Sequence, residues 1–222
     1  MDRYAARVVS FIARQLDPPD ILGELLFGLI MVLTLTLGAA VASGSQRGLI
    51  VAAIGANVAW GVIDAVLAVM GSRYARHRHG RLVRAIRAAR DEKSALAAIR
   101  DEFESGVEVE SRPEDREQLY RSIHAVFAHA RPRRMVIGKQ DVLTALAVFV
   151  LVVAPALPAV LPFLVVDDPH HALRISNALL VGLLFVVGYL WGRHIEIQPW
   201  LTAIGLTAIG VALVAIAIAL GG

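Results

Sequence analysis

The chain has 222 residues, of which 57% are apolar, and its mean hydropathy is +0.63. Only 18% of the residues are charged, compared with about 25% in an average soluble protein, and there is no cysteine. These properties exclude a water-soluble domain, a disordered chain, a disulfide-built scaffold and any thiolate metal site.

Long apolar runs dominate the chain. A transmembrane helix needs about 20 mostly apolar residues to cross a hydrocarbon core of about 30 Å. Five such runs cover residues 21–42, 49–70, 142–166, 173–191 and 200–220. Because none of them alternates in polarity, we predict an all-α membrane protein with five transmembrane helices. Pro155, Pro158 and Pro162 predict a kink in the outer half of the third span, and Asp168 with Pro169 predicts a capped start of the fourth.

The basic residues indicate the topology. Of the 22 Lys and Arg residues, 20 precede the first span, lie between the second and third, or follow the fourth, and only Arg47 and Arg174 lie on the opposite side. The positive-inside rule therefore predicts a cytoplasmic N-terminus and an outer C-terminus. We expect a cytoplasmic leader over residues 1–20, two spans within 21–71, a cytoplasmic insert over 72–139 and three spans within 140–222. No soluble basic face is present, so no nucleic-acid partner is expected.

The cytoplasmic insert carries three apolar stripes at helical spacing, which predict three short amphipathic helices. Its first part is rich in arginine, and residues 101–117 are mainly acidic. Carboxylates are suitable ligands for Mn²⁺ or Fe²⁺, and a histidine lies on the same helical face as one of them. The candidate metal ligands are Glu102, Glu104, Glu114, Glu117 and His124. The alternative is a solvated acidic surface that balances the arginines.

Few polar residues lie within the spans, where an ionisable group marks a functional site or a buried pair. Glu24 lies about one turn into the first span, where it could equally favour the helix N-terminus. Asp64 lies about 9 Å inside the cytoplasmic end of the second span, and Asn57, two turns earlier, faces the same way. We interpret these residues, with Met31 as a soft ligand, as the lining of a transport path. The alternatives are interhelical hydrogen bonding and, for Met31, ordinary packing.

Two stretches resemble a known family. Glu24, Phe27, Gly28 and Leu29 resemble an acidic-x-x-aromatic/aliphatic-Gly-Leu opening of the first span, and residues 56–61 resemble an Ala-Glu-x-x-x-Gly stretch of the second. Both are features of the vacuolar iron transporter family, which also has five spans and a carboxylate-bearing helical insert between the second and third. In that family an aspartate central to transport follows the first motif. Here that place reads Ile30-Met31-Val32, and Asn57 replaces the glutamate of the second motif.

The resemblance implies an integral membrane transporter that moves Fe²⁺ or Mn²⁺ out of the cytosol in exchange for protons. It further implies a homodimer in the lipid bilayer, here of a bacterial inner membrane, with the ion as cargo and no tightly bound cofactor. Motifs of an enzyme nucleophile, phosphate loop or metalloprotease are absent from the sequence, so no enzyme is expected. Because the first-span aspartate is missing, the alternative is a non-transporting membrane scaffold or sensor built on the same fold.

Overall fold

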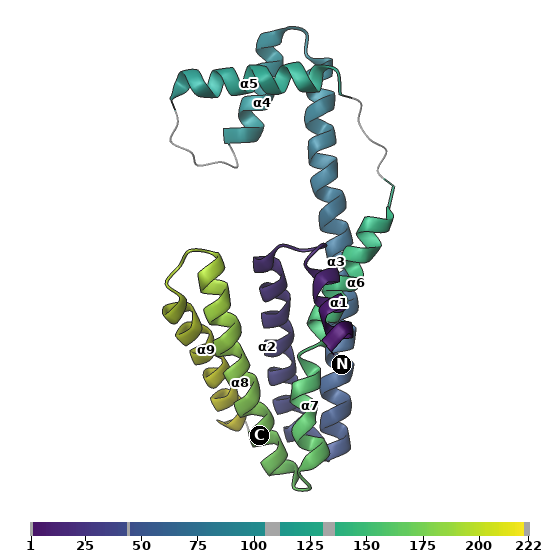
Figure 1. The fold of residues 1–222 in the computed structure, drawn as a ribbon, viewed down its shortest axis with the longest axis vertical. Helices are drawn as coiled ribbons and strands as arrows, with labels where there is room; N and C mark the ends of the chain where they lie inside the picture. The colour runs from purple at the N-terminus through teal and green to yellow at the C-terminus, as the bar shows by residue number, and fades with distance from the viewer. Residues whose placement is uncertain (1, 44, 105–111, 131–135, 220–222) are drawn as a thin grey trace. The chain divides into compact units, whose positions relative to one another are not determined.

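The computed structural model describes residues 2–43, 45–104, 112–130 and 136–219, and within these ranges all regular secondary structure is helical (Figure 1). The helices in chain order are α1 (Asp2–Ile12), α2 (Pro18–Ser43), α3 (Gln46–Ala88), α4 (Glu92–Glu104), α5 (Pro113–Ala128), α6 (Lys139–Val153), α7 (Ala156–Val165), α8 (Pro169–His194) and α9 (Pro199–Ala219). The chain divides into two compact units. Met1–Val69 and Lys139–Gly222 form one, and Met70–Gly138 forms the other.

Four stretches of the described chain are long and apolar enough to cross a membrane: Arg47–Ala88, Lys139–Val165, Pro169–His194 and Pro199–Ile216. They coincide with the second to fifth predicted spans. The first predicted span coincides with α2, whose side chains are described only from Pro18 to Thr34. An all-helical chain with several membrane-spanning helices is therefore confirmed, and the count of five remains a prediction. We call Met1–Val69 with Lys139–Gly222 the membrane unit.

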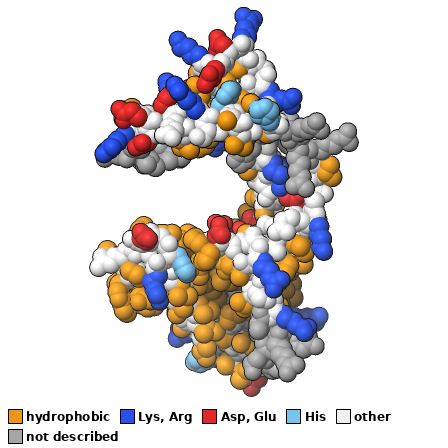
Figure 2. All heavy atoms as spheres, turned by 45° about the horizontal axis from the view of Figure 1, so that its top comes forward, with side chains coloured by type: hydrophobic (Ala, Val, Ile, Leu, Met, Phe, Trp, Pro, Cys, Tyr) orange, Lys and Arg blue, Asp and Glu red, His pale blue; other side chains and the backbone are white. Residues whose placement is uncertain are grey.

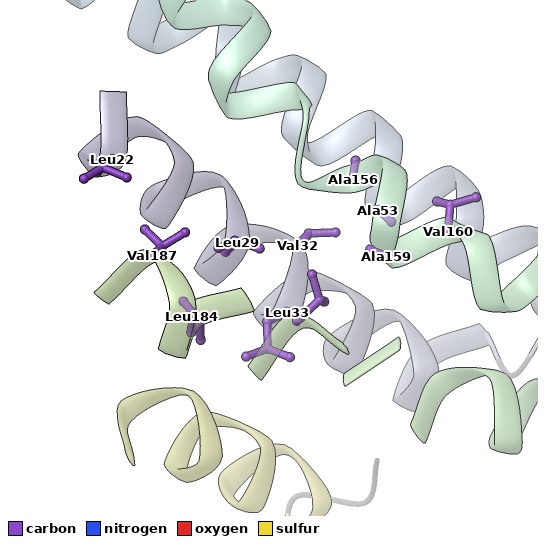
Figure 3. Close-up of a cluster of buried hydrophobic side chains, with 11 residues drawn as sticks. Leu22, Leu29, Val32, Leu33, Ala53, Ala156, Ala159, Val160, Leu184 and Val187 are labelled. Atoms are coloured by element: carbon purple, nitrogen blue, oxygen red, sulfur yellow. The ribbon is translucent and has the colours of Figure 1, made fainter. Parts of the chain in front are cut away.

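The core of the membrane unit surrounds α2, which packs against α6, α7, α8 and α9. Figure 3 shows Leu29, Val32 and Leu33 of α2 between small side chains on one side and larger ones of α8 on the other. The small residues are Ala53 of α3 with Ala156 and Ala159 of α7, and the larger ones include Leu184 and Val187. Small side chains let helices approach closely, which favours van der Waals packing inside a bilayer.

The third predicted span is broken near its middle. α6 ends at Val153 and α7 begins at Ala156, with Pro155 between them. Proline has no N–H, so the carbonyl four residues earlier loses its partner and the helix cannot continue unchanged. The predicted kink is confirmed, but Pro155 alone interrupts the helix, because Pro158 and Pro162 lie within α7.

The start of α8 is capped as predicted. The carboxylate of Asp168 accepts hydrogen bonds from the backbone N–H groups of His170 and His171, at 2.8 and 3.4 Å. Its second oxygen lies 2.7 Å from Nδ1 of His171. The hydrogen bond with the His171 side chain, helped by the backbone of His170, lowers the pKa of Asp168 below its ordinary value.

The unit Met70–Gly138, which we call the helical module, has a small core of its own. Leu82 and Ile86 from the end of α3 pack with Ile99 of α4 and Tyr120 of α5, and Phe103 stacks against Tyr120 with ring centroids 6.3 Å apart. Figure 2 shows charged side chains gathered on this module and mainly hydrophobic side chains over the visible face of the membrane unit. The apolar stripes predicted from the sequence therefore supply the module's interior.

Two helices differ from the sequence expectation. We predicted a span ending near Met70 and a separate helix around residues 82–89, but α3 runs unbroken through both. Gly71 and Gly80 cost only about 1 kcal/mol each in a helix, and no proline interrupts the segment. The predicted leader contains α1, whose Ile12 packs against Ala147 and Leu151 of α6.

Candidate functional site

Two carboxylates face each other across α2 and α3. Glu24 and Asp64 are both half-buried, and their negative charges repel each other. One carboxylate oxygen of Asp64, Oδ2, is buried and has no hydrogen-bond partner. Two like charges with an unpartnered buried oxygen form an electrostatically unfavourable arrangement, which a bound cation would relieve.

Asn57 joins three helices about two turns away from Asp64 along α3. Its side chain is completely buried, and its Nδ2 donates hydrogen bonds to the carbonyl oxygens of Gly28 in α2 (3.2 Å) and Val152 in α6 (2.8 Å). Val152 lies just before the interruption at Pro155, where backbone carbonyls need partners from outside the helix. Asn57 Oδ1 is buried without a partner. The amide therefore closes the helix junction with its nitrogen and leaves an oxygen available.

The helices at this junction are in close contact because two glycines lie there. A Cβ atom added to Gly28 would lie 2.6 Å from the carbonyl oxygen of Val152 and 2.9 Å from Cγ of Pro155. A Cβ added to Gly61, one turn after Asn57, would lie 3.1 Å from the ring of Phe149 in α6. The short distances show that α2 approaches α6 closely at Gly28 and that α3 approaches α6 closely at Gly61.

The cross-helix contacts fix the register of α2 against α3. Glu24 interacts with Asp64, the ring of Phe27 lies 5.9 Å from that of Trp60 in an edge-to-face arrangement, and Gly28 accepts from Asn57. The two helices therefore run antiparallel. Residues three and four apart share a helix face, so Glu24, Gly28 and Met31 form one stripe of α2. Asn57, Gly61 and Asp64 form the corresponding stripe of α3.

Of the predicted path residues, the structure brings Glu24 and Asp64 together and places Asn57 on the same side of α3. Met31 has a half-buried side chain on the stripe of α2 that contains Glu24. Sequence reasoning missed the backbone carbonyls of Gly28 and Val152. The signal for them was present, since a helix break at Pro155 leaves nearby carbonyls in need of donors and a glycine in α2 allows close approach.

The predicted metal ligands of the insert are dispersed. Glu102 forms an ion pair with Arg78, and Glu117 forms ion pairs with Arg100 (3.1 Å) and Arg121 (3.7 Å). The other candidates are Glu114, which is exposed, His124, which is half-buried, and Glu104, whose side chain lies outside the described part of the chain. Among the side chains that are described, no group of three or more His, Asp or Glu residues could hold a metal ion. A metal site in the insert remains a prediction.

Comparison with known proteins assigns the family. Residues 75–222, more than half of the chain, match the model of the VIT family. The chain belongs to the vacuolar iron transporter family. A search of curated proteins finds no match. The match to the vacuolar iron transporter family begins at residue 75, after both motifs around Glu24 and Asn57, so it is independent of them. This is a family of membrane metal-ion transporters and not of enzymes, which agrees with the apolar helices of an integral membrane protein.

Proposed function

We propose that this vacuolar iron transporter family member carries Fe²⁺ or Mn²⁺ out of the cytosol between α2 and α3, in exchange for protons. The observation that carries the proposal is the buried, unpartnered Oδ2 of Asp64 opposite Glu24. An acid in a membrane-spanning helix is costly unless it serves a pair or a pathway. Asp64 faces a second acid instead of a base, and a metal-ion transporter requires negatively charged oxygen ligands of this kind.

The donor atoms favour hard and borderline divalent ions. Asp64, Glu24 and the free Oδ1 of Asn57 offer oxygen, the donor type that suits Mn²⁺ and Fe²⁺. The thioether of Met31 would add a softer donor on the stripe that contains Glu24. Cysteine is absent, so thiolate ligands do not compete for the ion.

Proton exchange follows from the same two carboxylates. Their mutual repulsion is relieved either by one divalent cation or by protons, so the two ligands compete for one site. Release of the metal on the far side then favours protonation, and the protonated pair returns without a cation.

We place the N-terminus in the cytoplasm and the C-terminus outside, in a bacterial inner membrane, and we propose a homodimer.

The acidic residues of the insert would deliver the ion. Glu102, Glu114, Glu117 and His124 are the described candidates, and a metal bound there would compete with the arginines that pair with Glu102 and Glu117. These ion pairs also favour the second candidate function, a non-transporting scaffold or sensor, because they give the acids a structural role. Titration of the purified protein with Mn²⁺ distinguishes the two: binding that weakens in Glu114→Gln and Glu117→Gln supports delivery.

Uptake by proteoliposomes tests the main proposal. We expect Mn²⁺ uptake with the unaltered protein, and a loss of at least tenfold in Asp64→Asn and in Glu24→Gln, because each removes a charged ligand. Asp167→Asn is the matched control, since Asp167 is an exposed acid in the loop before α8. Uptake that is unchanged by Asp64→Asn would refute the role of Asp64, and no uptake of any divalent ion would favour the scaffold.

A further inference from the structure

Asn177 in α8 is a buried polar residue that the path described above does not use. The buried polar or charged side chains among the described residues are Asn57, Asp141, Ser176 and Asn177. Asp141 makes interactions of its own, and Ser176 Oγ donates to the carbonyl of Ala159 at 2.8 Å. The two asparagines differ from these, because each leaves Oδ1 buried without a hydrogen-bond partner. An orphaned buried oxygen in a native structure requires an explanation.

The packing of α3 and α8 gives the relative depths of the two asparagines. Leu49 of α3 packs with Leu173 of α8, so both helices start at the same end of the membrane unit. With a helix rise of 1.5 Å per residue, Asn177 lies about 6 Å from that level, Asn57 about 12 Å and Asp64 about 22 Å. The three residues with unpartnered oxygens are therefore spaced over about 16 Å, about half the thickness of a hydrocarbon core of about 30 Å.

A cluster of buried apolar side chains adjoins both asparagines. Ala53 lies one turn before Asn57, and Leu180 lies three residues after Asn177, and both belong to one cluster with Ala156 and Ala159. These four side chains are at most 2% exposed. On the same scale Ala53 lies at about 6 Å, level with Asn177, and Leu180 at about 10 Å, close to the level of Asn57, so the two asparagines lie within the apolar core of the unit.

We propose that the buried, unpartnered Oδ1 of Asn177 is a further oxygen ligand for the transported divalent cation, about 6 Å closer than Asn57 to the starts of α3 and α8. This inference rests on the proposed transport function. The ligand is a neutral amide, which holds a cation less tightly than the carboxylates at Glu24 and Asp64. A weak site suits the exit side, because conduction requires that the ion bind strongly enough to enter and weakly enough to leave.

The absence of cysteine from the chain gives a direct test. Asn177→Cys introduces a single thiol, whose reaction with a positively charged, membrane-impermeant thiol reagent is measured with and without Cd²⁺. We expect the thiol at position 177 to react, and saturating Cd²⁺ to slow that reaction about tenfold. Ser176→Cys is the matched control, since Ser176 is adjacent, also buried and bonded to Ala159, and its thiol should show no protection by Cd²⁺.

A second variant covers the case in which the introduced thiol disturbs folding. Asn177→Val should lower the initial rate of Mn²⁺ uptake about tenfold, whereas Ser176→Ala should retain it. An unreactive thiol, equal reaction rates with and without Cd²⁺, or full uptake by a folded Asn177→Val protein would each overturn the inference. Failure of the unaltered protein to transport any divalent ion would refute the proposed function instead. The Cd²⁺ protection assay does not require transport, so its result tests the role of Asn177 independently of the proposed function.

Discussion

Replacing Gly28 with alanine tests the junction of α2, α3 and α6. The new Cβ would lie 2.6 Å from the carbonyl oxygen of Val152, and ordinary contact begins at 3.4 Å, so α2 and α6 must separate by about 0.8 Å. Val152 O is a backbone atom and cannot rotate away. The separation also stretches the hydrogen bonds from Asn57, which are already 3.2 and 2.8 Å long.

The magnitude follows from three contributions. Overpacking costs about 1–3 kcal/mol. Two interhelical hydrogen bonds in a membrane contribute about 0.6 kcal/mol each. The higher helix propensity of alanine offsets up to about 1 kcal/mol. We therefore expect Gly28→Ala to lower the free energy of unfolding by about 1–3 kcal/mol.

The assay is unfolding in mixed detergent and SDS micelles, followed by the fluorescence of the three tryptophans. Gly182→Ala is the matched control, because a Cβ at Gly182 in α8 would meet no atom within 4 Å. That variant should be as stable as the unaltered protein or slightly more so. If Gly28→Ala unfolds at the same SDS fraction as Gly182→Ala, the close approach of α2 to α6 is not what holds the junction together.

Three further perturbations probe separate contacts. Asn57→Leu removes both interhelical hydrogen bonds and should cost about 1–2 kcal/mol in the same unfolding assay, with a less than additive effect when combined with Gly28→Ala. The lowered pKa of Asp168 means that its cap contributes fully above about pH 4 and is lost as the pH falls through that lowered value. Hydrogen exchange of the amides that Asp168 caps, corrected for intrinsic rates, should therefore accelerate in acid. The Asp168→Asn protein should show no such acceleration. In the helical module, Ile99→Ala should lower the free energy of unfolding by about 2–5 kcal/mol because Ile99 is fully buried. Glu117→Gln should lower it by less than about 1 kcal/mol because the ion pairs of Glu117 are partly exposed. Thermal unfolding that ranks the two variants in the opposite order would contradict these assignments.

The parts of the fold that depend on local chemistry were predictable from the sequence. Apolar runs located the membrane-spanning helices, Pro155 located the break, and Asp168 located the start of α8. Each follows from a residue type that changes hydrogen bonding or burial by itself. The unbroken α3 was missed because a drop in hydropathy after Met70 resembles a helix end, although no proline interrupts the helix there.

The candidate site was only partly predictable for a different reason. The spacing of Asn57 and Asp64 on α3 follows from helix geometry, but their pairing with α2 depends on how each helix is rotated about its axis. A single sequence does not fix that rotation. Likewise, the sequence of the insert reads the same whether its glutamates bind a metal or pair with arginines. The ion pairs of Glu102 and Glu117 are seen only in the three-dimensional structure.

The break at Pro155 also bears on biosynthesis. A proline inside a nascent transmembrane segment leaves carbonyl groups in need of donors while the segment enters the bilayer. Here the donor for Val152 is Asn57, and the glycine that makes room for the broken segment is Gly28. Both are synthesised earlier in the chain, so the helices that accommodate the break are already made when it emerges from the ribosome. The order of the sequence therefore matches the order in which this junction can be assembled.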